Sequence, residues 1–188
     1  MPLDSVGKTG HAFGMPSWDG SKGSIEALHR YWSSRAGGLA PQRNDIDPAD
    51  IKPLLPFLYI VRYEREPFRV RYILTGTEAD RWNGFSLTGR YVDEFLATDI
   101  NGANRILLDA YASAFHTAAP VFGTYSWPTR TGYTLEVRFG MFPLRVGEQI
   151  EQCLAIEDYS GFPPAIANDG VPFEDVAPKP SDATKRGS

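Results

Sequence analysis

Three aspartates in the run QRNDIDPAD could together hold a metal ion. Asp45, Asp47 and Asp50 lie close in sequence, and carboxylates are ligands that Ca²⁺ prefers. A calcium-binding EF-hand loop that began at Asp45 would need glycine at its sixth position and glutamate at its twelfth, but this chain has Asp50 and Pro56 there. The same residues suit backbone roles, because Asp47 before Pro48 is a typical helix N-cap and Asp50 would face the positive end of the helix dipole. The run therefore predicts a short capped helix and no metal site.

Histidine and cysteine, the other residues that hold cofactors, are sparse. His116 lies in a helical pattern over residues 99–117, but at about 100° per residue it points away from the apolar side, so haem ligation through it is disfavoured. His29 fits a partly exposed packing residue, and no two histidines have the spacing of metal ligands. Cys153 has no cationic neighbour in sequence, and the chain lacks the Asn-Cys-Arg motif of flavin-thioether photosensors, so Cys153 is interpreted as a small buried apolar residue. We predict no cofactor, with haem and flavin both disfavoured.

The composition indicates an acidic globular protein of one domain. The chain has 188 residues, of which 42% are apolar and 13% aromatic, enough to form a core. A net charge of −4 and a pI near 5.4 argue against binding to nucleic acid or to an anionic membrane, because both require clustered positive charge. The single cysteine cannot form an internal disulfide, and no apolar run is long enough for a membrane span or a signal peptide. We therefore expect a soluble protein of the cytoplasm.

The two ends of the chain differ in composition from its middle. Residues 1–23 are rich in Gly, Ser and Lys, and residues 161–188 are rich in Pro and polar side chains, so both are predicted to be flexible tails. Met15 is an alternative start to Met1. The periodic patterns are confined to residues 24–160, which we expect to form the single domain.

The middle of the chain alternates between strand and helix patterns. Its first helix carries Ile25, Leu28 and Trp32 on one side and ends before a pair of glycines. Two strands, a group of short helical pieces, the helix of residues 99–117 and three more strands follow. Adjacent strands joined by short turns form antiparallel sheets, so we predict an α+β fold: a five-stranded antiparallel sheet with helices packed on one face and an N-terminal flanking helix. The predicted strands are residues 57–63, residues 68–75, and the sequences PVFGTYSW, YTLEVRFGMFPLR and EQCLAIEDY.

The second predicted strand has two different faces. Arg69 and Arg71 fall on one face. The other face, which we expect to be buried, carries Phe68, Val70, Tyr72 and Leu74. Because two glutamates are interspersed among the arginines of this hairpin, the face of the arginines is interpreted as solvated; a face that binds a partner is the alternative. The arginines are Arg62, Arg65, Arg69 and Arg71.

Several sequence blocks, in this order, resemble a known family. They are Tyr31-Trp32, Pro41-x-Arg43-x-Asp45-Ile46-Asp47-Pro48 with Leu54-Leu55-Pro56, Tyr72-x-Leu74-x-Gly76-Thr77, Gly84-x-x-Leu87-Thr88-Gly89-Arg90, and Pro143-Leu144. Over residues 24–160 the chain resembles the short, largely stand-alone PAS-domain proteins found mostly in alphaproteobacteria. Two positions depart from the family pattern: Ser86, where many relatives carry Asp, and Gln42, where many carry Ser.

The resemblance implies a PAS fold, in which a five-stranded sheet and helices surround a cavity. Such domains bind small molecules, pass signals through dimer contacts, or both, and the resemblance implies no shared reaction. We therefore predict a non-enzymatic sensory or signalling module that binds a small molecule, a protein partner or both. One alternative is a small hydrolase or isomerase that uses the same cavity, for which Asp80 and Glu136 are the acids to inspect. Another is a structural interaction domain with a filled core.

Aromatic residues and one arginine are the candidates for a ligand pocket. Buried Tyr and Trp need partners for their polar atoms, so several in one cavity wall suit an amphipathic ligand; an ordinary aromatic core is the alternative. Arg90 is the candidate cation at the rim for an acidic ligand, with an ion pair to Asp93 or Glu94 as the alternative. The predicted pocket residues are Tyr72, Trp82, Arg90, Tyr111, Trp127 and Phe139, with Tyr125 as a further aromatic near the same space.

The first helix is the candidate surface for self-association. It is amphipathic, so we expect it to pack on an edge of the sheet or to pair with its twin in a homodimer through residues 25–35. No kinase, cyclase or DNA-binding segment is recognisable, so we expect a signal to pass to a separate protein partner or through a rearrangement of the dimer.

Overall fold

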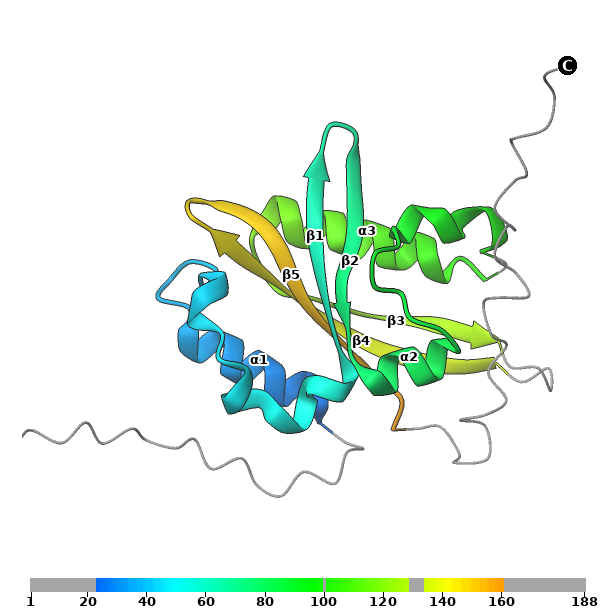
Figure 1. The fold of residues 1–188 in the computed structure, drawn as a ribbon, viewed down its shortest axis with the longest axis horizontal. Helices are drawn as coiled ribbons and strands as arrows, with labels where there is room; N and C mark the ends of the chain where they lie inside the picture. Colours follow the sequence, from blue (N-terminus) through cyan, green and yellow to red (C-terminus); the bar gives the residue numbers. More distant parts are fainter. Residues whose placement is uncertain (1–22, 100, 129–133, 161–188) are drawn as a thin grey trace, which may run out of the picture.

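The structure is a computed structural model, and it describes residues 23–99, 101–128 and 134–160. These residues form a twisted five-stranded sheet with helices on both faces (Figure 1). Except for Gly23, the two predicted tails lie outside the described residues, as does the alternative start at Met15.

The sheet contains the five predicted strands in the spatial order β2-β1-β5-β4-β3. Every neighbouring pair is antiparallel. The first and last strands are therefore neighbours at the centre of the sheet, and backbone hydrogen bonds join the two halves of the domain. The strands are β1 (Leu58–Arg65), β2 (Phe68–Thr75), β3 (Val121–Pro128), β4 (Thr134–Val146) and β5 (Gln149–Asp158).

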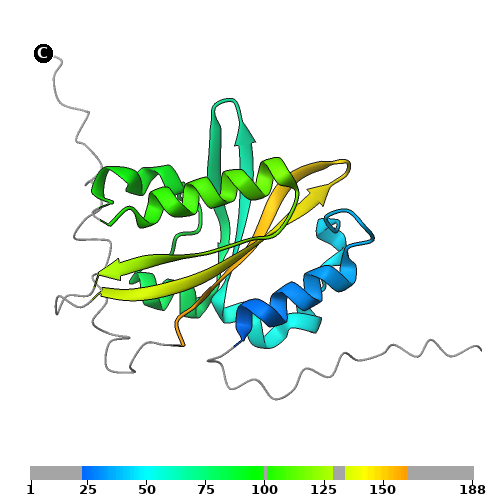
Figure 2. The same cartoon turned by 180° about the vertical axis from the view of Figure 1, so that it is seen from behind.

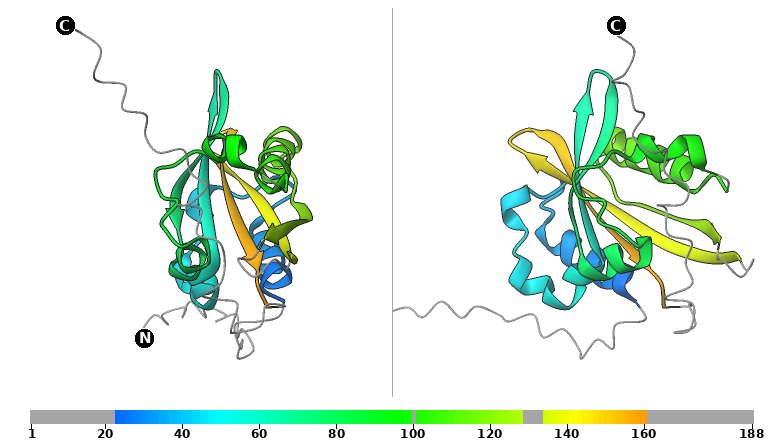
Figure 3. Two further views of the ribbon diagram at one scale, coloured as in Figure 1. Left: turned by 90° about the vertical axis from the view of Figure 1, so that its right-hand side faces the viewer. Right: turned by 45° about the vertical axis from the view of Figure 1, so that its right-hand side comes forward.

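Helices α2, η3 and α3 pack on one face of the sheet, as predicted, and we call this the inner face. The flanking helix α1 lies on the other, outer face together with η1 and η2. Figures 1 and 2 view the domain from opposite sides, and in both α3 lies on one side of β1 and β2. In the right-hand view of Figure 3 the sheet runs between α1 and α3. The helices are α1 (Ser24–Arg35), η1 (Arg43–Asp45), η2 (Pro48–Phe57), α2 (Thr77–Asn83), η3 (Val92–Thr98) and α3 (Ala103–Thr117). A membrane-crossing helix, which needs a long apolar run, does not occur among the helices of the described residues.

The sequence of α1 explains its place on the outer face. Ile25, Leu28 and Trp32 recur at helical spacing and are buried, as predicted. They pack against residues of β4 and β5, and Trp32 donates its indole N–H to the backbone oxygen of Pro143 at 2.9 Å. The apolar side of α1 is therefore used within the chain.

Two of the three early aspartates, Asp45 and Asp47, accept hydrogen bonds from the backbone, as predicted, whereas Asp50 binds side chains. Asp47 is the N-cap of η2 and accepts a hydrogen bond from the backbone nitrogen of Ala49 at 2.9 Å. Asp50 accepts hydrogen bonds from the Tyr31 hydroxyl at 3.3 Å and from Arg35 at 2.5 Å, so it joins η2 to α1. Across the described ranges, no group of three or more His, Cys, Asp or Glu side chains is placed to hold a metal ion.

The alternation of side chains in the β1–β2 hairpin breaks at one point. Tyr72 is buried on the inner face, as predicted, but Leu74 has 47% of its surface exposed, so the prediction that Leu74 is buried was wrong. The cause is a shift in register: Tyr72 pairs with Val61 and Leu74 pairs with Ile60, which leaves one extra residue in β2 between them. Leu74 thus lies opposite Ile60, whose side chain packs against the outer-face core.

Candidate functional site

The core on the inner face is rich in aromatic side chains. It contains all five of the predicted pocket aromatics, each of them buried. They come from five different elements, so only the tertiary fold brings them together. Their role in binding stays a prediction. The five are Tyr72 of β2, Trp82 of α2, Tyr111 of α3, Trp127 of β3 and Phe139 of β4.

Arg90, the sixth predicted pocket residue, lies at the edge of this core and is partly exposed. Its Nε donates to Oε2 of Glu94 at 2.6 Å, and its guanidinium lies 5.1 Å from the ring centroid of Phe95. The other acid that the sequence offered, Asp93, pairs with Arg69 at 2.9 Å. The geometry therefore matches the interpretation of Arg90 as the partner of Glu94 in an ion pair.

A carboxyl group is buried inside the aromatic core. The hydroxyl of Tyr59 donates to Oε2 of Glu157 at 2.7 Å, the hydroxyl of Tyr159 donates to the same oxygen, and the two hydroxyl oxygens are 3.0 Å apart. Asn83 donates through Nδ2 to the hydroxyl of Tyr59 at 3.3 Å and to the backbone oxygen of Ala79 at 2.8 Å. Within the described part of the chain, no lysine, arginine or histidine forms an ion pair with Glu157.

Burial and hydrogen bonding act on the Glu157 carboxyl in opposite directions. Burial raises its pKa, because a charge is costly in a medium of low dielectric constant, and hydrogen bonds from Tyr159, Tyr59 and Tyr125 lower it; the net shift is upward from 4.5. Burial also raises the pKa of each of these tyrosines well above 10, so their hydroxyls stay protonated at neutral pH. We call Glu157, the three tyrosines and Asn83 the Glu157 cluster.

The alternation of side chains along β5 places Glu157 on the inner face of the sheet. Cys153 and Ala155 belong to the inner-face core and Leu154 to the outer-face core, so the next residue of the inward series is Glu157. Tyr59 lies opposite Ala155 on the adjacent strand β1, which places its hydroxyl beside the carboxyl.

Two of the predicted pocket residues border this cluster. The indole of Trp82 stacks on the ring of Tyr159 with centroids 5.0 Å apart and an interplanar angle of 14°. The indole of Trp127 meets the same ring edge-on at 6.3 Å and 89°. The cluster therefore combines hydrogen-bonding groups with flat apolar surfaces.

Sequence reasoning missed Glu157 and named other acids. Asp80 is partly exposed and accepts a hydrogen bond from the Thr75 hydroxyl, and Glu136 is exposed on β4. The alternation in CLAIE, with its two large aliphatic residues facing one way, was the signal that could have placed Glu157 on the inner face.

A second polar group is buried elsewhere on the inner face. The Tyr63 hydroxyl has no hydrogen-bond partner among the described residues, and its ring lies between Phe68 at 5.9 Å and Phe115 at 5.0 Å. Burial, and to a lesser extent the thiol of Cys153, raises the pKa of Tyr63, and a thiol is only a weak hydrogen-bond partner. Cys153 is buried, as predicted, and burial raises the pKa of its thiol to about 12, so the thiol is unreactive at neutral pH.

The described histidines lie where the sequence placed them. His116 is exposed in the last turn of α3, and its ring stacks on that of Phe68 with centroids 6.1 Å apart. His29 is partly exposed and packs its ring against Phe122 at 5.1 Å and Phe142 at 5.8 Å. Neither contacts the Glu157 cluster through a described hydrogen bond.

Comparison with known proteins identifies the family. A family model described as "PAS domain" matches residues 21–154. The chain belongs to the PAS-domain family. The match confirms the resemblance to PAS proteins, and the range of organisms stays a prediction. A comparison with curated proteins finds no match.

Solved structures that resemble this PAS domain share little sequence with it. A light-oxygen-voltage domain studied with a flavin analogue aligns with a TM-score of 0.44 and 12% identity, covering 58% of this chain and 80% of the other. An RNA-binding light-oxygen-voltage receptor aligns with a TM-score of 0.44 and 16% identity, covering 65% of this chain and 36% of the other. The PAS domain of an HTR-like protein from Haloarcula marismortui has a TM-score of 0.37 and 16% identity, covering 70% and 94%.

Proposed function

We propose that this PAS domain is a sensory module that recognises a small molecule in its inner core and passes the signal to a protein partner without catalysing a reaction. The observation that carries the proposal is the Glu157 cluster. A buried carboxyl without a cation costs free energy, and tyrosine hydroxyls offset only part of that cost. A role in binding accounts for such a group at this place in the core.

The chemistry of the cluster favours an amphipathic ligand with a hydrogen-bond donor. Glu157 accepts hydrogen bonds, and the hydroxyls of Tyr59 and Tyr159 can donate or accept as they rotate. The rings of Trp82 and Trp127 offer flat apolar contacts beside them. We therefore propose a flat ligand that directs an N–H or O–H group at Glu157. An acidic ligand bound through Arg90 is less favoured, because Arg90 would first have to leave Glu94.

One observation favours the alternative of a hydrolase or isomerase. A carboxyl whose pKa is shifted upward is the kind of group that acts as a general acid or base. Its hydrogen-bond partners are tyrosines whose pKa values are raised far from neutrality, so they are poor bases and poor nucleophiles. Binding without reaction is the function that this chemistry supports better.

Native mass spectrometry of the gently purified full chain tests the proposal. We expect a mass excess that disappears on denaturation and that is reduced in the Glu157→Gln variant, which keeps the shape of the side chain but not its charge. Glu136→Gln is the matched control, because it removes the same charge from an exposed position on β4. The control should retain the excess mass.

Two results would overturn the proposal. A mass excess that Glu157→Gln leaves unchanged would place the ligand away from the cluster. A ligand-free mass, together with no stabilisation above about 2 °C in a thermal-shift screen of flat amines and heteroaromatic alcohols, would contradict small-molecule binding.

Self-association through α1, residues 25–35, remains part of the proposed signalling role. The buried side of α1 is already packed on the sheet, so such a homodimer would use the polar side of the helix. Light scattering at several protein concentrations measures whether it forms.

A further inference from the structure

Two arginines lie opposite each other on the outer face of the β1–β2 hairpin. Arg62 is the register partner of Arg71, and both side chains are exposed. Like charges directly opposite each other across a sheet destabilise it. Arg71 donates through Nε to the backbone oxygen of Gly89 at 3.3 Å, but in the part of the chain that the structure describes neither arginine forms an ion pair. Positive charge is thus left uncompensated on a chain whose net charge is −4.

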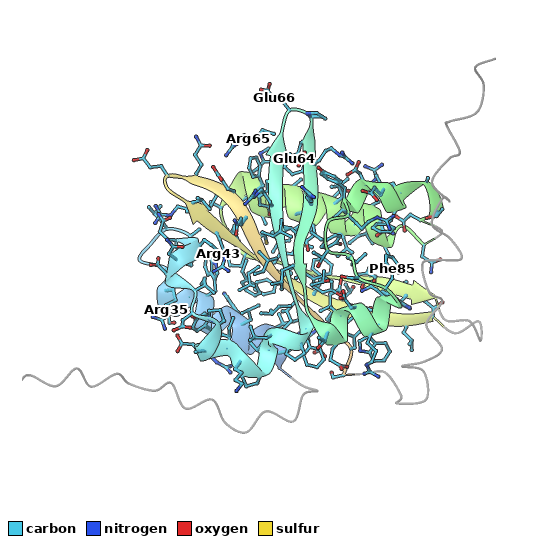
Figure 4. The ribbon with its side chains drawn as sticks, in the orientation of Figure 1. Arg35, Arg43, Glu64, Arg65, Glu66 and Phe85 are labelled. Carbon is cyan, nitrogen blue, oxygen red and sulfur yellow. The ribbon has the colours of Figure 1, made fainter. Side chains whose placement is uncertain are left out.

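The neighbouring row of side chains, toward the tip of the hairpin, is electrically balanced. Glu64 is the register partner of Arg69, and Arg69 forms an ion pair with Asp93 at 2.9 Å. Glu64 accepts a hydrogen bond from the hydroxyl of Tyr91 at 2.8 Å, and the guanidinium of Arg69 lies 3.6 Å from the centroid of the same ring. Figure 4 shows Glu64 near the tip. The nearest carboxylates are therefore already engaged by other groups.

The row on the other side, toward the base of the hairpin, is apolar and partly exposed. Leu74 is 47% exposed and lies opposite Ile60, two residues before Arg62. Gln152 lies beside Arg62 on β5, is only 8% exposed, and has no hydrogen-bond partner for its Oε1 among the described residues. Two cations, an exposed leucine and an unpaired buried acceptor thus lie in adjacent rows of one face.

We propose that Arg62, Arg71 and Leu74 form a docking surface for an acidic segment of a partner protein. We call these residues the arginine–leucine surface. Arginine binds a carboxylate through two parallel hydrogen bonds, and two arginines side by side suit two acidic residues of one segment. Leu74 would bury an apolar side chain that lies next to those acids.

The charges on this surface favour an acidic protein over other occupants. A second copy of the chain, related by a two-fold axis, would place the arginines of one copy against those of the other. Nucleic acid is disfavoured by the net charge of −4 and by the leucine within the surface. The charge complementarity thus points to a partner that supplies carboxylates around one large apolar residue.

The arginine–leucine surface extends the proposed signalling role and does not depend on an interior ligand. Strand β1 contributes a residue to each of the two proposed sites. Tyr59 belongs to the Glu157 cluster on the inner face, whereas Arg62 lies on the outer face. A change in the core that moves β1 would therefore reach the docking surface directly.

Titration of the ¹⁵N-labelled full chain with the synthetic peptide acetyl-DEELFEED-amide tests the inference. We expect the amide and Arg Nε–H signals of Arg62, Arg71 and Leu74 to shift and the affinity to fall as salt screens the charges. The double variant Arg62→Glu/Arg71→Glu should weaken binding at least about tenfold. Leu74→Ser should weaken it by a smaller factor, because only the apolar contact is lost.

The matched control is Arg30→Glu/Arg105→Glu, which changes the net charge equally at exposed positions on α1 and α3. It should bind the peptide as the wild type does. Equal losses in both double variants, shifts centred elsewhere, or no binding at about 1 mM peptide would overturn the inference. If Arg62→Glu/Arg71→Glu fails to fold, Arg62→Gln/Arg71→Gln removes the charges without adding repulsion and carries the same expectation. A partner test that fails would leave the interior-ligand proposal standing, because mass spectrometry measures that separately.

Discussion

The two faces of the sheet are both covered but differ in chemistry. On the outer face, α1 and η2 pack aliphatic side chains and Phe142 so closely that a Cβ on Gly140 would lie 2.9 Å from the Cγ2 of Ile25. On the inner face, the core holds the Glu157 carboxyl and a Tyr63 hydroxyl that has no partner among the described residues. The outer-face core is thus formed by apolar packing, whereas the inner-face core retains polar groups that packing does not require.

This difference separates the part of the domain that packing stabilises from the part to which we assign ligand recognition. Removal of an outer-face side chain creates a cavity, and its cost should depend little on pH or ligand. The effect on stability of substituting the inner polar groups should instead depend on their protonation and on any bound ligand. Three measurements test the comparison.

The largest effect is expected from Phe142→Ala. Phe142 is fully buried between β4 and α1, so its truncation removes contacts that no other side chain can replace. We expect the free energy of unfolding in urea to fall by about 4 kcal/mol, without a change in the pH dependence. A loss below about 1 kcal/mol would show that the outer face is less tightly packed than described.

The Glu157→Gln variant should change how stability depends on pH. Because the pKa of Glu157 is raised above 4.5 in the folded state, the native protein holds this proton more tightly than the unfolded chain does. The stabilisation that this proton gives to the folded state is thus fully present below pH 4.5, and it is lost as the pH rises through the folded-state pKa of Glu157. Relative to the wild type, Glu157→Gln should gain at most about 1.4 kcal/mol per pH unit within that window.

Urea unfolding of both proteins at several pH values measures this difference, with Glu136→Gln as the exposed control. If the two unfolding free energies stayed parallel across the window, the carboxyl would titrate as an ordinary solvated group.

The smallest effects should come from a matched pair of tyrosine variants. Tyr59→Phe removes a hydroxyl that donates to Glu157, and we expect a loss of about 1 kcal/mol. Tyr63→Phe removes a buried hydroxyl without a described partner, so stability should stay unchanged or rise by up to about 1 kcal/mol. Thermal unfolding of the two variants side by side measures the contrast. Equal losses would indicate that both hydroxyls are satisfied.

The parts of the fold that follow from local patterns were predictable. Strand alternation located the five strands, and the Asp47-Pro48 pair located the start of η2, because both signals lie within a few residues. Leu74 was placed wrongly, because an extra residue in β2 reverses the alternation of inward and outward side chains, and no glycine or proline in the sequence marks that position.

The candidate site was only partly predictable. The five pocket aromatics were found to share one core, because large aromatic residues in strands and helices tend to be buried. Glu157 was missed because an acidic residue near a strand end is usually exposed, and only its tyrosine partners make its burial tolerable. Tyr59 is separated from Glu157 by 98 residues in sequence, so no local pattern joins these two partners.

The distribution of tryptophans gives each face its own optical reporter. Trp82 and Trp127 both touch the ring of Tyr159 beside the carboxyl, whereas Trp32 lies across the sheet with its indole bonded to Pro143. Fluorescence from the first two indoles should respond to quenching or polarity changes in the inner core, and emission from the third should report only whether α1 stays docked. In variants that lack Trp18 and keep tryptophan on one face only, events in the two halves of the molecule can therefore be followed separately, without any added label.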